Sequence, residues 1–454
     1  MQMPKKNILS EMPRDLGDNL KLRFATPDDA DALTEFNVRL HEAEDAGPNV
    51  RDLMSGNHPT CQASDFTVVE DTTTGKIVSS MCLISQTWTY SGIPFAFGQP
   101  EFVATEPEYR RRGLVRKQFE VIHALSEARG EMMLGITGIP WYYRMFGYEM
   151  TLDMEAELVI DGIHIPALKD GETETCRLRP RTDADNAFIQ DLYARSIESQ
   201  VFACPRSPEL WEYEFNGRSP DSGARMEWLL IEDMEGTRLG YVQHLQWCYD
   251  GWGEGKDTDA NFMVMRMELK PGVGYLHLAP SLLRELWKKA KATPIVVESK
   301  VSAAAGIQFM LGREHLFYSV LPKSIVRKDL PYSWYIRIPN LMAFLRHIQP
   351  ALEKHLIGTV AEGYTGELKM SFYRSGIHFT FERGRITKLT NWIPEDIEDG
   401  DAVFPDLTFL HLLCGRCRIE ELTANFVDCW TKDTAAAVLL NSLFPEFKSE
   451  IWHL

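Results

Sequence analysis

A run of three arginines and a glycine, Arg110-Arg111-Arg112-Gly113, concentrates positive charge at one point of this 454-residue chain. The preceding residues, Phe102-Val103-Ala104-Thr105, predict a strand, and Glu106-Pro107-Glu108 breaks it. After the run, apolar residues recur at the spacing of an amphipathic helix, at Val115, Phe119, Ile122 and Leu125. The first N–H groups of a helix have no partner inside it, and the helix dipole is positive there, so this turn suits an anion. Gly113 lets the backbone approach a phosphate without an intervening Cβ. The alternative is a basic helix start that is merely solvated.

A second segment of interest follows a short apolar strand predicted at Met132 to Ile136. Pro140 suits the first position of a helix and Gly147 suits its C-terminal cap. The residues between them, Trp141-Tyr142-Tyr143-Arg144-Met145-Phe146, are rich in aromatic side chains. Two interpretations of Tyr143 stay open: a chemically active phenol or a packed core aromatic beside Tyr142.

Both segments resemble motifs of the GNAT superfamily of N-acetyltransferases. Arg110 to Val115 resembles the pattern Gln/Arg-x-x-Gly-x-Gly/Ala, from which Val115 departs, and Tyr143, Gly147 and Tyr148 resemble Tyr-x-x-x-Gly-Phe/Tyr. An aliphatic residue at position 115, together with Pro107 and Arg116, is similar to the Eis-type (enhanced intracellular survival) branch. The resemblance implies that acetyl-CoA is bound by Val103, Ala104, Thr105, Arg110, Arg111, Arg112, Gly113, Leu114, Val115 and Arg116.

The same resemblance implies that Tyr143 is the general acid, protonating the departing thiolate. The chemistry is consistent with this role, because amine attack on a thioester needs a neutral amine, a polarised carbonyl and a protonated leaving group. A strand N–H near Val103 would polarise the carbonyl. In the Eis-type family the C-terminal carboxylate is proposed as base, which here belongs to Leu454; His453 is the alternative by residue type.

An internal repeat predicts two related α/β units. Leu22 to Asp29 resembles Leu178 to Asp185, and each copy predicts a strand, a Thr N-cap and a helix with capping-box spacing. A β-hairpin is predicted in each copy, at 66–84 and at 228–245. The second copy lacks the arginine run, so we expect one cofactor site for each chain.

The C-terminal segment has a different pattern, with a helix predicted over 338–356 and alternating strands at 368–372 and 377–381. The Eis-type resemblance extends here and implies a domain similar to sterol carrier proteins. We therefore expect an α/β and α+β protein: tandem GNAT domains, each a mixed central sheet flanked by helices, at 20–162 (catalytic) and 163–331 (degenerate), then a sterol-carrier-like α+β domain at 332–454. The resemblance also implies a hexamer.

Composition limits the partners. A formal net charge of −17 argues against nucleic-acid binding and is compatible with a cationic substrate. We expect no metal site, no membrane span and a cytoplasmic location, since no signal peptide is visible and the eight cysteines are scattered. The acidic cluster of Glu42, Glu44 and Asp45 and the aromatic residues Trp88 and Tyr90 are candidate walls for the acceptor.

The sequence favours direct acetyl transfer from acetyl-CoA to a primary amine on a cationic acceptor, such as an aminoglycoside, a polyamine or a lysine. Two other functions remain open. The chain could bind a hydrophobic ligand through its third domain, or it could sense acetyl-CoA without turning it over.

Overall fold

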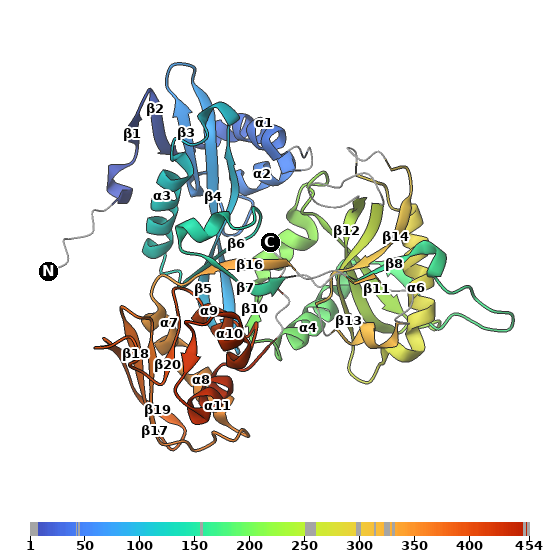
Figure 1. Ribbon diagram of the computed structural model, residues 1–454. Coiled ribbons are helices and arrows are strands. Elements are labelled where there is room, and N and C mark those ends of the chain that lie inside the picture. The colour runs from blue at the N-terminus through green and yellow to red at the C-terminus, as the bar shows by residue number, and fades with distance from the viewer. Residues whose placement is uncertain are drawn as a thin grey trace.

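The computed structural model describes residues 8–41, 43, 46–154, 158–249, 260–296, 301–312, 315–321, 327–328, 332–447 and 451. They form three units, each built on its own β-sheet, arranged as three lobes (Figure 1). None of the helices in these ranges is long and apolar enough to cross a membrane.

The first unit is a mixed sheet with helices on both faces. Its strands lie in the order β1 (Arg14–Gly17), β2 (Leu20–Phe24), β3 (Phe66–Asp71), β4 (Lys76–Tyr90), β5 (Ile93–Thr105), β6 (Met133–Ile136), β16 (Tyr332–Arg337) and β7 (Glu149–Met154). Its helices are α1 (Ala30–His41), α2 (Ala46–Met54) and α3 (Leu114–Ala128). One apolar cluster joins α1 and α2 to the sheet, and another joins α3 to it.

The second unit repeats this plan. Its strands lie in the order β15 (Arg327–Lys328), β8 (Leu158–Asp161), β14 (Ala304–Phe309), β13 (Ala260–Leu269), β12 (Arg238–Tyr249), β11 (Met226–Glu232) and β9 (Arg177–Pro180). Its helices are α4 (Asn186–Ile197), α5 (Pro208–Glu212) and α6 (Tyr275–Ala292).

The predicted repeat is confirmed in its local details. Thr26 with Asp29, and Thr182 with Asp185, each form a complete capping box before α1 and α4. Both predicted hairpins are present, as β3–β4 and β11–β12. The two copies of the repeat therefore begin in the same way, with a capped helix start and a hairpin.

The two units exchange one strand, which the sequence did not indicate. β8 follows β7 in the chain but pairs with β14 and β15 in the second sheet. β16 follows β15 in the chain but lies between β6 and β7 in the first sheet. The two exchanged strands occupy equivalent positions, so neither sheet is complete without a strand from beyond its own unit. The range 332–454, expected as the third domain, consequently opens with a strand of the first sheet.

In the third unit, helices pack against one mixed β-sheet. Its strands lie in the order β19 (Arg385–Trp392), β18 (Gly376–Glu382), β17 (Gly366–Ser371), β20 (Ala402–Val403) and β21 (Trp430–Thr431). Its helices are α7 (Leu341–His347), α8 (Gln349–Leu356), α9 (Phe409–Leu413), α10 (Ile419–Asn425) and α11 (Thr434–Leu443). The helix predicted over 338–356 is two helices, because Pro350 cannot continue the hydrogen bonding of α7 and instead begins α8.

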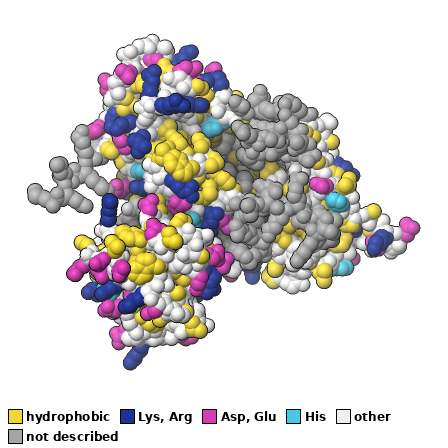
Figure 2. Space-filling model, viewed as in Figure 1, with side chains coloured by type: hydrophobic (Ala, Val, Ile, Leu, Met, Phe, Trp, Pro, Cys, Tyr) yellow, Lys and Arg dark blue, Asp and Glu magenta, His cyan; other side chains and the backbone are white. Residues whose placement is uncertain are grey.

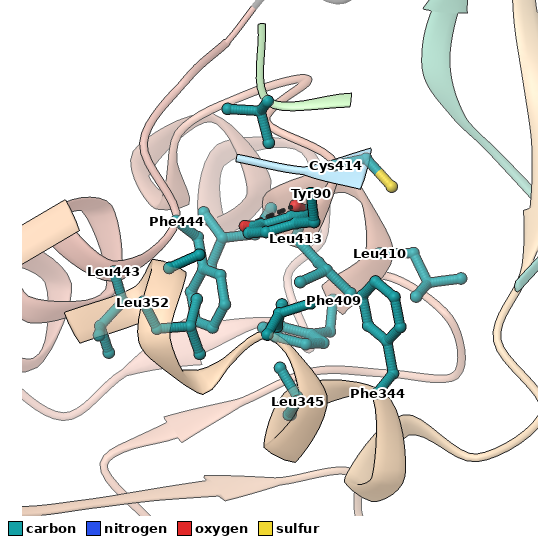
Figure 3. Close-up of a cluster of buried hydrophobic side chains, with 14 of the residues drawn as sticks. Tyr90, Phe344, Leu345, Leu352, Phe409, Leu410, Leu413, Cys414, Leu443 and Phe444 are labelled. Atoms are coloured by element: carbon teal, nitrogen blue, oxygen red, sulfur yellow. Dashed lines mark hydrogen bonds between the residues drawn. The ribbon is translucent and has the colours of Figure 1, made fainter. Parts of the chain in front are cut away.

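The tip of the β4–β5 hairpin joins all three units. Tyr90 lies among apolar side chains of α7, α8, α9 and α11, and its hydroxyl donates a hydrogen bond to the Leu413 carbonyl at 3.4 Å (Figure 3). Its ring also meets that of Phe202 edge-on at 5.1 Å; Phe202 comes from the sequence range of the second unit but lies in β10 (Phe202–Ala203), which pairs with β4. The interpretation of Trp88 and Tyr90 as acceptor walls is wrong, since both are core residues, 0% and 1% exposed. The long hairpin carries them out of the first unit and into the junction.

Candidate active site

The start of α3 is an exposed, uncapped helix N-terminus. Gly113 is the N-cap residue and has a left-handed backbone (φ 76°), so it offers no side-chain oxygen to the first-turn N–H groups. The first turn also carries no acidic side chain. These N–H groups are left available to an anion, in agreement with the expectation for this turn.

Four guanidinium groups surround this turn without being neutralised. Arg110, Arg111, Arg112 and Arg116 are exposed or nearly so, and no carboxylate of the described residues forms an ion pair with any of them. Arg110 Nε donates to the Thr105 carbonyl at 3.1 Å, and Arg116 lies over the ring of Phe146 at 5.4 Å. In a chain of net charge −17, four cations without ion pairs in the described residues, beside open N–H groups, are an arrangement that suits a multiply charged anion.

The strand before this turn opens away from its neighbour. β5 and β6 pair only at Phe97 with Met133 and Gly98 with Leu134, although β5 continues to Thr105. On the β4 side the register shifts between Ser80 and Cys82, and Phe102 has a positive φ of 53°, as in a β-bulge. In the described part of the chain no strand pairs with β5 on its β6 side from Glu101 onward, so Val103, Ala104 and Thr105 lie along an open backbone edge. An extended ligand with amide groups can pair with such an edge.

Tyr143 lies in η5 (Tyr142–Phe146), a short 3-10 helix after β6, and its side chain is only 4% exposed. Its ring meets those of Phe119, Tyr142 and Tyr335 edge-on, in the same apolar cluster against which Val103 packs. Burial, and next the negative charge of Glu101, raise the pKa of Tyr143 well above that of a free phenol. Tyr143 is therefore protonated at any ordinary pH.

Glu101 is a site residue that the sequence interpretation missed. It follows Pro100 on β5, immediately before the bulge, and burial raises its pKa above the usual range of a carboxyl. Gln99 Nε2 donates to Glu101 Oε2 at 2.7 Å and orients it. Gln99 is itself held by Gln86, whose Nε2 donates to Gln99 Oε1 at 2.6 Å. The signal in the sequence was an acidic residue inside a mostly apolar strand, where an unpaired charge is costly.

Apolar side chains are exposed around the loop that leads to Tyr143. Ile139, Trp141 and Met145 are 54%, 61% and 41% exposed. A patch of hydrophobic side chains, flanked by Lys and Arg side chains, is visible on the face of the molecule shown in Figure 2. Exposed apolar surface beside a cationic turn suits a ligand that has both apolar and anionic parts.

Comparison with known families identifies the first unit. Residues 21–151 match the family model described as acetyltransferase (GNAT) domain. This chain carries an N-acetyltransferase domain of the GNAT type. The arginine turn, the open edge of β5 and Tyr143 all lie inside the matched range.

Solved structures share the fold over nearly the whole chain. They include a conserved protein of unknown function from Enterococcus faecalis V583, described as a probable N-acyltransferase (13% identity, TM-score 0.62, covering 94% of this chain and 97% of that one). A GCN5-related N-acetyltransferase from Anabaena variabilis has 14% identity and a TM-score of 0.61, with the same shares covered. Eis1 from Mycobacterium abscessus has 12% identity and a TM-score of 0.59, covering 95% and 98%. The comparison with curated proteins gives no match.

The second unit differs from the GNAT domain at the equivalent turn. Between β13 and α6 it has Lys270-Pro271-Gly272-Val273-Gly274, with one Lys and no Arg where the turn between β5 and α3 has three arginines. The structure thus places the arginine cluster beside only one of the two equivalent helices.

Several predicted residues lie outside the described part of the chain: Leu454, His453, Glu42, Glu44 and Asp45. Ile451, three residues before the C-terminus, is described and buried. Its carbonyl accepts a hydrogen bond from Trp334 Nε1 of β16 at 3.0 Å, so Ile451 contacts the sheet of the GNAT domain.

Proposed function

We propose that the protein transfers an acetyl group directly from acetyl-CoA to a primary amine of a cationic acceptor such as an aminoglycoside, a polyamine or a lysine. The observation that carries the proposal is the uncapped start of α3 with its four free arginines, which lies next to the open edge of β5. The first feature fits the phosphates of coenzyme A, and the second fits the amide groups of its pantetheine arm. The residues involved are Val103, Ala104, Thr105 and Arg110 to Arg116.

In this proposal Tyr143 donates the proton to the thiolate that leaves. A buried phenol with a raised pKa is protonated at the pH of the reaction, so Tyr143 holds a proton for the sulfur atom as the thiolate leaves. The β5 backbone near Val103 polarises the carbonyl that is attacked.

Two carboxylates compete for the role of base. Glu101 is supported by its place on β5 and by its raised pKa, which brings it closer to the range in which a carboxylate accepts a proton from an ammonium group. The C-terminal carboxylate of Leu454 is implied by the Eis-type resemblance. We assign the base to Glu101, because it lies on β5 two residues before Val103, where the carbonyl is polarised, and Gln99 orients its carboxylate. The acidity of the chain as a whole supports a cationic acceptor.

The test is the release of coenzyme A from acetyl-CoA in the presence of aminoglycosides, polyamines and lysine peptides. We expect turnover with at least one cationic amine, and a loss of about 100-fold in kcat in Tyr143→Phe. Tyr142→Phe is the matched control, since Tyr142 is the adjacent phenol of the same helix. Full activity of Tyr143→Phe would remove the residue from its role. Tight acetyl-CoA binding without turnover of any amine would favour the alternative of an acetyl-CoA sensor.

The choice between the two bases has its own test. Glu101→Gln should lower kcat by about 100-fold. Adding one glycine after Leu454 displaces the terminal carboxylate but leaves Glu101 in place, and we expect this variant to keep its activity. Full activity of Glu101→Gln, together with loss of activity in the variant with the added glycine, would assign the base to Leu454.

The Eis-type resemblance supports three further proposals. The third unit would be a sterol-carrier-like domain, the chain would assemble into a hexamer, and it would act in the cytoplasm. Sedimentation equilibrium of the full chain tests the hexamer directly, and a monomer would contradict it. Binding of a lipid to a chain without acetyltransferase activity would favour the second alternative function, a hydrophobic-ligand-binding protein.

A further inference from the structure

Two tyrosine hydroxyls of the exchanged strand β16 hold the loop that leads to Tyr143. The Tyr332 hydroxyl accepts a hydrogen bond from Gly138 N at 3.1 Å and donates one to the Gly138 carbonyl. The Tyr335 hydroxyl accepts a hydrogen bond from Trp141 N at 2.5 Å. In each case the two partners are 194 residues apart in the sequence.

The loop positions held in this way adjoin the proposed acid. Gly138 has a left-handed backbone (φ 109°), and a Cβ placed on it would lie 3.6 Å from the Tyr143 hydroxyl oxygen. Trp141, the other residue held, is the N-cap residue of η5 and precedes Tyr143 by two positions. The hydrogen bonds from β16 therefore fix both the wall beside the phenol oxygen and the start of the helix that carries it.

The ring of Tyr335 also contacts Tyr143 directly. The two rings meet edge-on, with centroids 5.5 Å apart and planes at 66°. Tyr335 is fully buried, and Arg144 lies over its ring at 5.8 Å. A side chain locked on both sides in this way restricts the rotation of its neighbour.

We propose that Tyr332 and Tyr335, which we call the tyrosine clamp, are positioning residues. They fix the position of the Tyr143 hydroxyl and exclude water from it. This inference rests on the proposed role of Tyr143 as general acid. It has a consequence for the whole protein: the range 21–151, which matches the acetyltransferase family, is catalytically incomplete without the strand at 332–337. The second unit thus separates two parts of one active site along the chain.

The physical reason is the geometry of proton transfer. A general acid must stay within hydrogen-bond reach of the leaving atom, and a misplacement of about 1 Å can cost about 100-fold in rate. If the clamp hydroxyls are removed, the loop gains freedom and water gains access to Tyr143. Its pKa then falls from its raised value toward that of a free phenol, because burial is the largest cause of the shift.

The experiment uses the full chain with Tyr335→Phe and Tyr332→Phe, which remove one hydroxyl each and keep the ring. We expect kcat to fall about tenfold in Tyr335→Phe, while KM for acetyl-CoA changes less than about twofold, since the arginine turn is untouched. The alkaline limb of the kcat profile should move to lower pH in both variants. Tyr364→Phe is the control, because Tyr364 also donates its hydroxyl hydrogen to a backbone carbonyl, that of Glu367 at 3.1 Å, in the third unit.

A double-mutant cycle separates positioning from general stability. In a Tyr143→Phe background, Tyr335→Phe should have less than about a twofold further effect on kcat, since there is no acid left to position. An equal tenfold loss in both backgrounds would overturn the clamp while leaving the role of Tyr143 intact. Wild-type kcat in Tyr143→Phe itself would instead overturn the proposed acid, and the clamp with it.

The cycle needs folded protein, which circular dichroism and thermal melting establish for each variant. Should Tyr335→Phe fail to fold, Tyr332→Phe carries the same test, because Tyr332 lies at the start of β16 and is only half-buried. A parallel shift of kcat and of the melting temperature in Tyr364→Phe would show that loss of any tyrosine hydroxyl lowers the rate, and would overturn the proposal.

Discussion

Replacing Arg111 and Arg112 together by glutamine removes two of the four cations at the start of α3 and should weaken acetyl-CoA binding. A hydrogen bond to a charged group contributes about 1.5–3 kcal/mol when it is shielded from water. Both arginines are exposed, so we reduce this to about 1 kcal/mol for each. The sum, about 2 kcal/mol, corresponds to an affinity about 30-fold lower. We expect kcat at saturating acetyl-CoA to change little, because the proposal gives both residues a role in binding the phosphates and none in the transfer step.

Isothermal titration with coenzyme A and with pantetheine measures this effect. Pantetheine lacks the phosphates, so its affinity should be the same for wild type and variant, whereas that of coenzyme A should fall. The difference in coenzyme A affinity between wild type and variant should also shrink at high salt, because exposed charges are screened. Arg374→Gln is the control, an exposed arginine of the third unit without a described ion pair. Unchanged coenzyme A affinity, or an equal loss for both ligands, would refute the phosphate site.

Three further predictions follow from burial and charge. The rate should fall as the pH drops through the raised pKa of Glu101, since the base must be deprotonated, and Glu101→Gln should abolish this acid limb in a pH–kcat profile. Burial lowers the pKa values of His58 and His123 from 6.5 to about 3. Below about pH 6.5 the unfolded chain therefore binds more protons than the folded one, and the melting temperature should fall; no fall between pH 6.5 and 4 would contradict this. Tyr90→Ala should lower the free energy of unfolding in urea by about 4 kcal/mol, whereas a change below about 1 kcal/mol would show that the junction is loosely packed.

Local chemistry made much of the fold predictable. The capping boxes of Thr26 and Thr182 depend on residues three positions apart, so the sequence alone revealed where both copies of the repeat begin. The arginine turn was predictable for the same reason, since strand, glycine and helix start follow one another within a dozen residues.

Long-range pairing was not predictable. The pattern of β16 is that of any buried strand, and nothing in it indicates that its partners are β6 and β7 rather than strands nearer in sequence. The prediction of Trp88 as a wall of the acceptor site was wrong for the same reason. The length of the β4–β5 hairpin decides whether such a residue borders a site or lies in a junction between units. Glu101 was missed because its raised pKa comes from surroundings contributed by distant segments.

The central claim is that acetyl-CoA bound at the arginine turn gives its acetyl group to an amine. The most direct measurement is mass spectrometry of a polyamine or lysine peptide incubated with the protein and acetyl-CoA labelled in the acetyl carbons. We predict one labelled acetyl group on a primary amine for each coenzyme A released, and almost none with Tyr143→Phe. Release of coenzyme A without label on any amine would contradict the account.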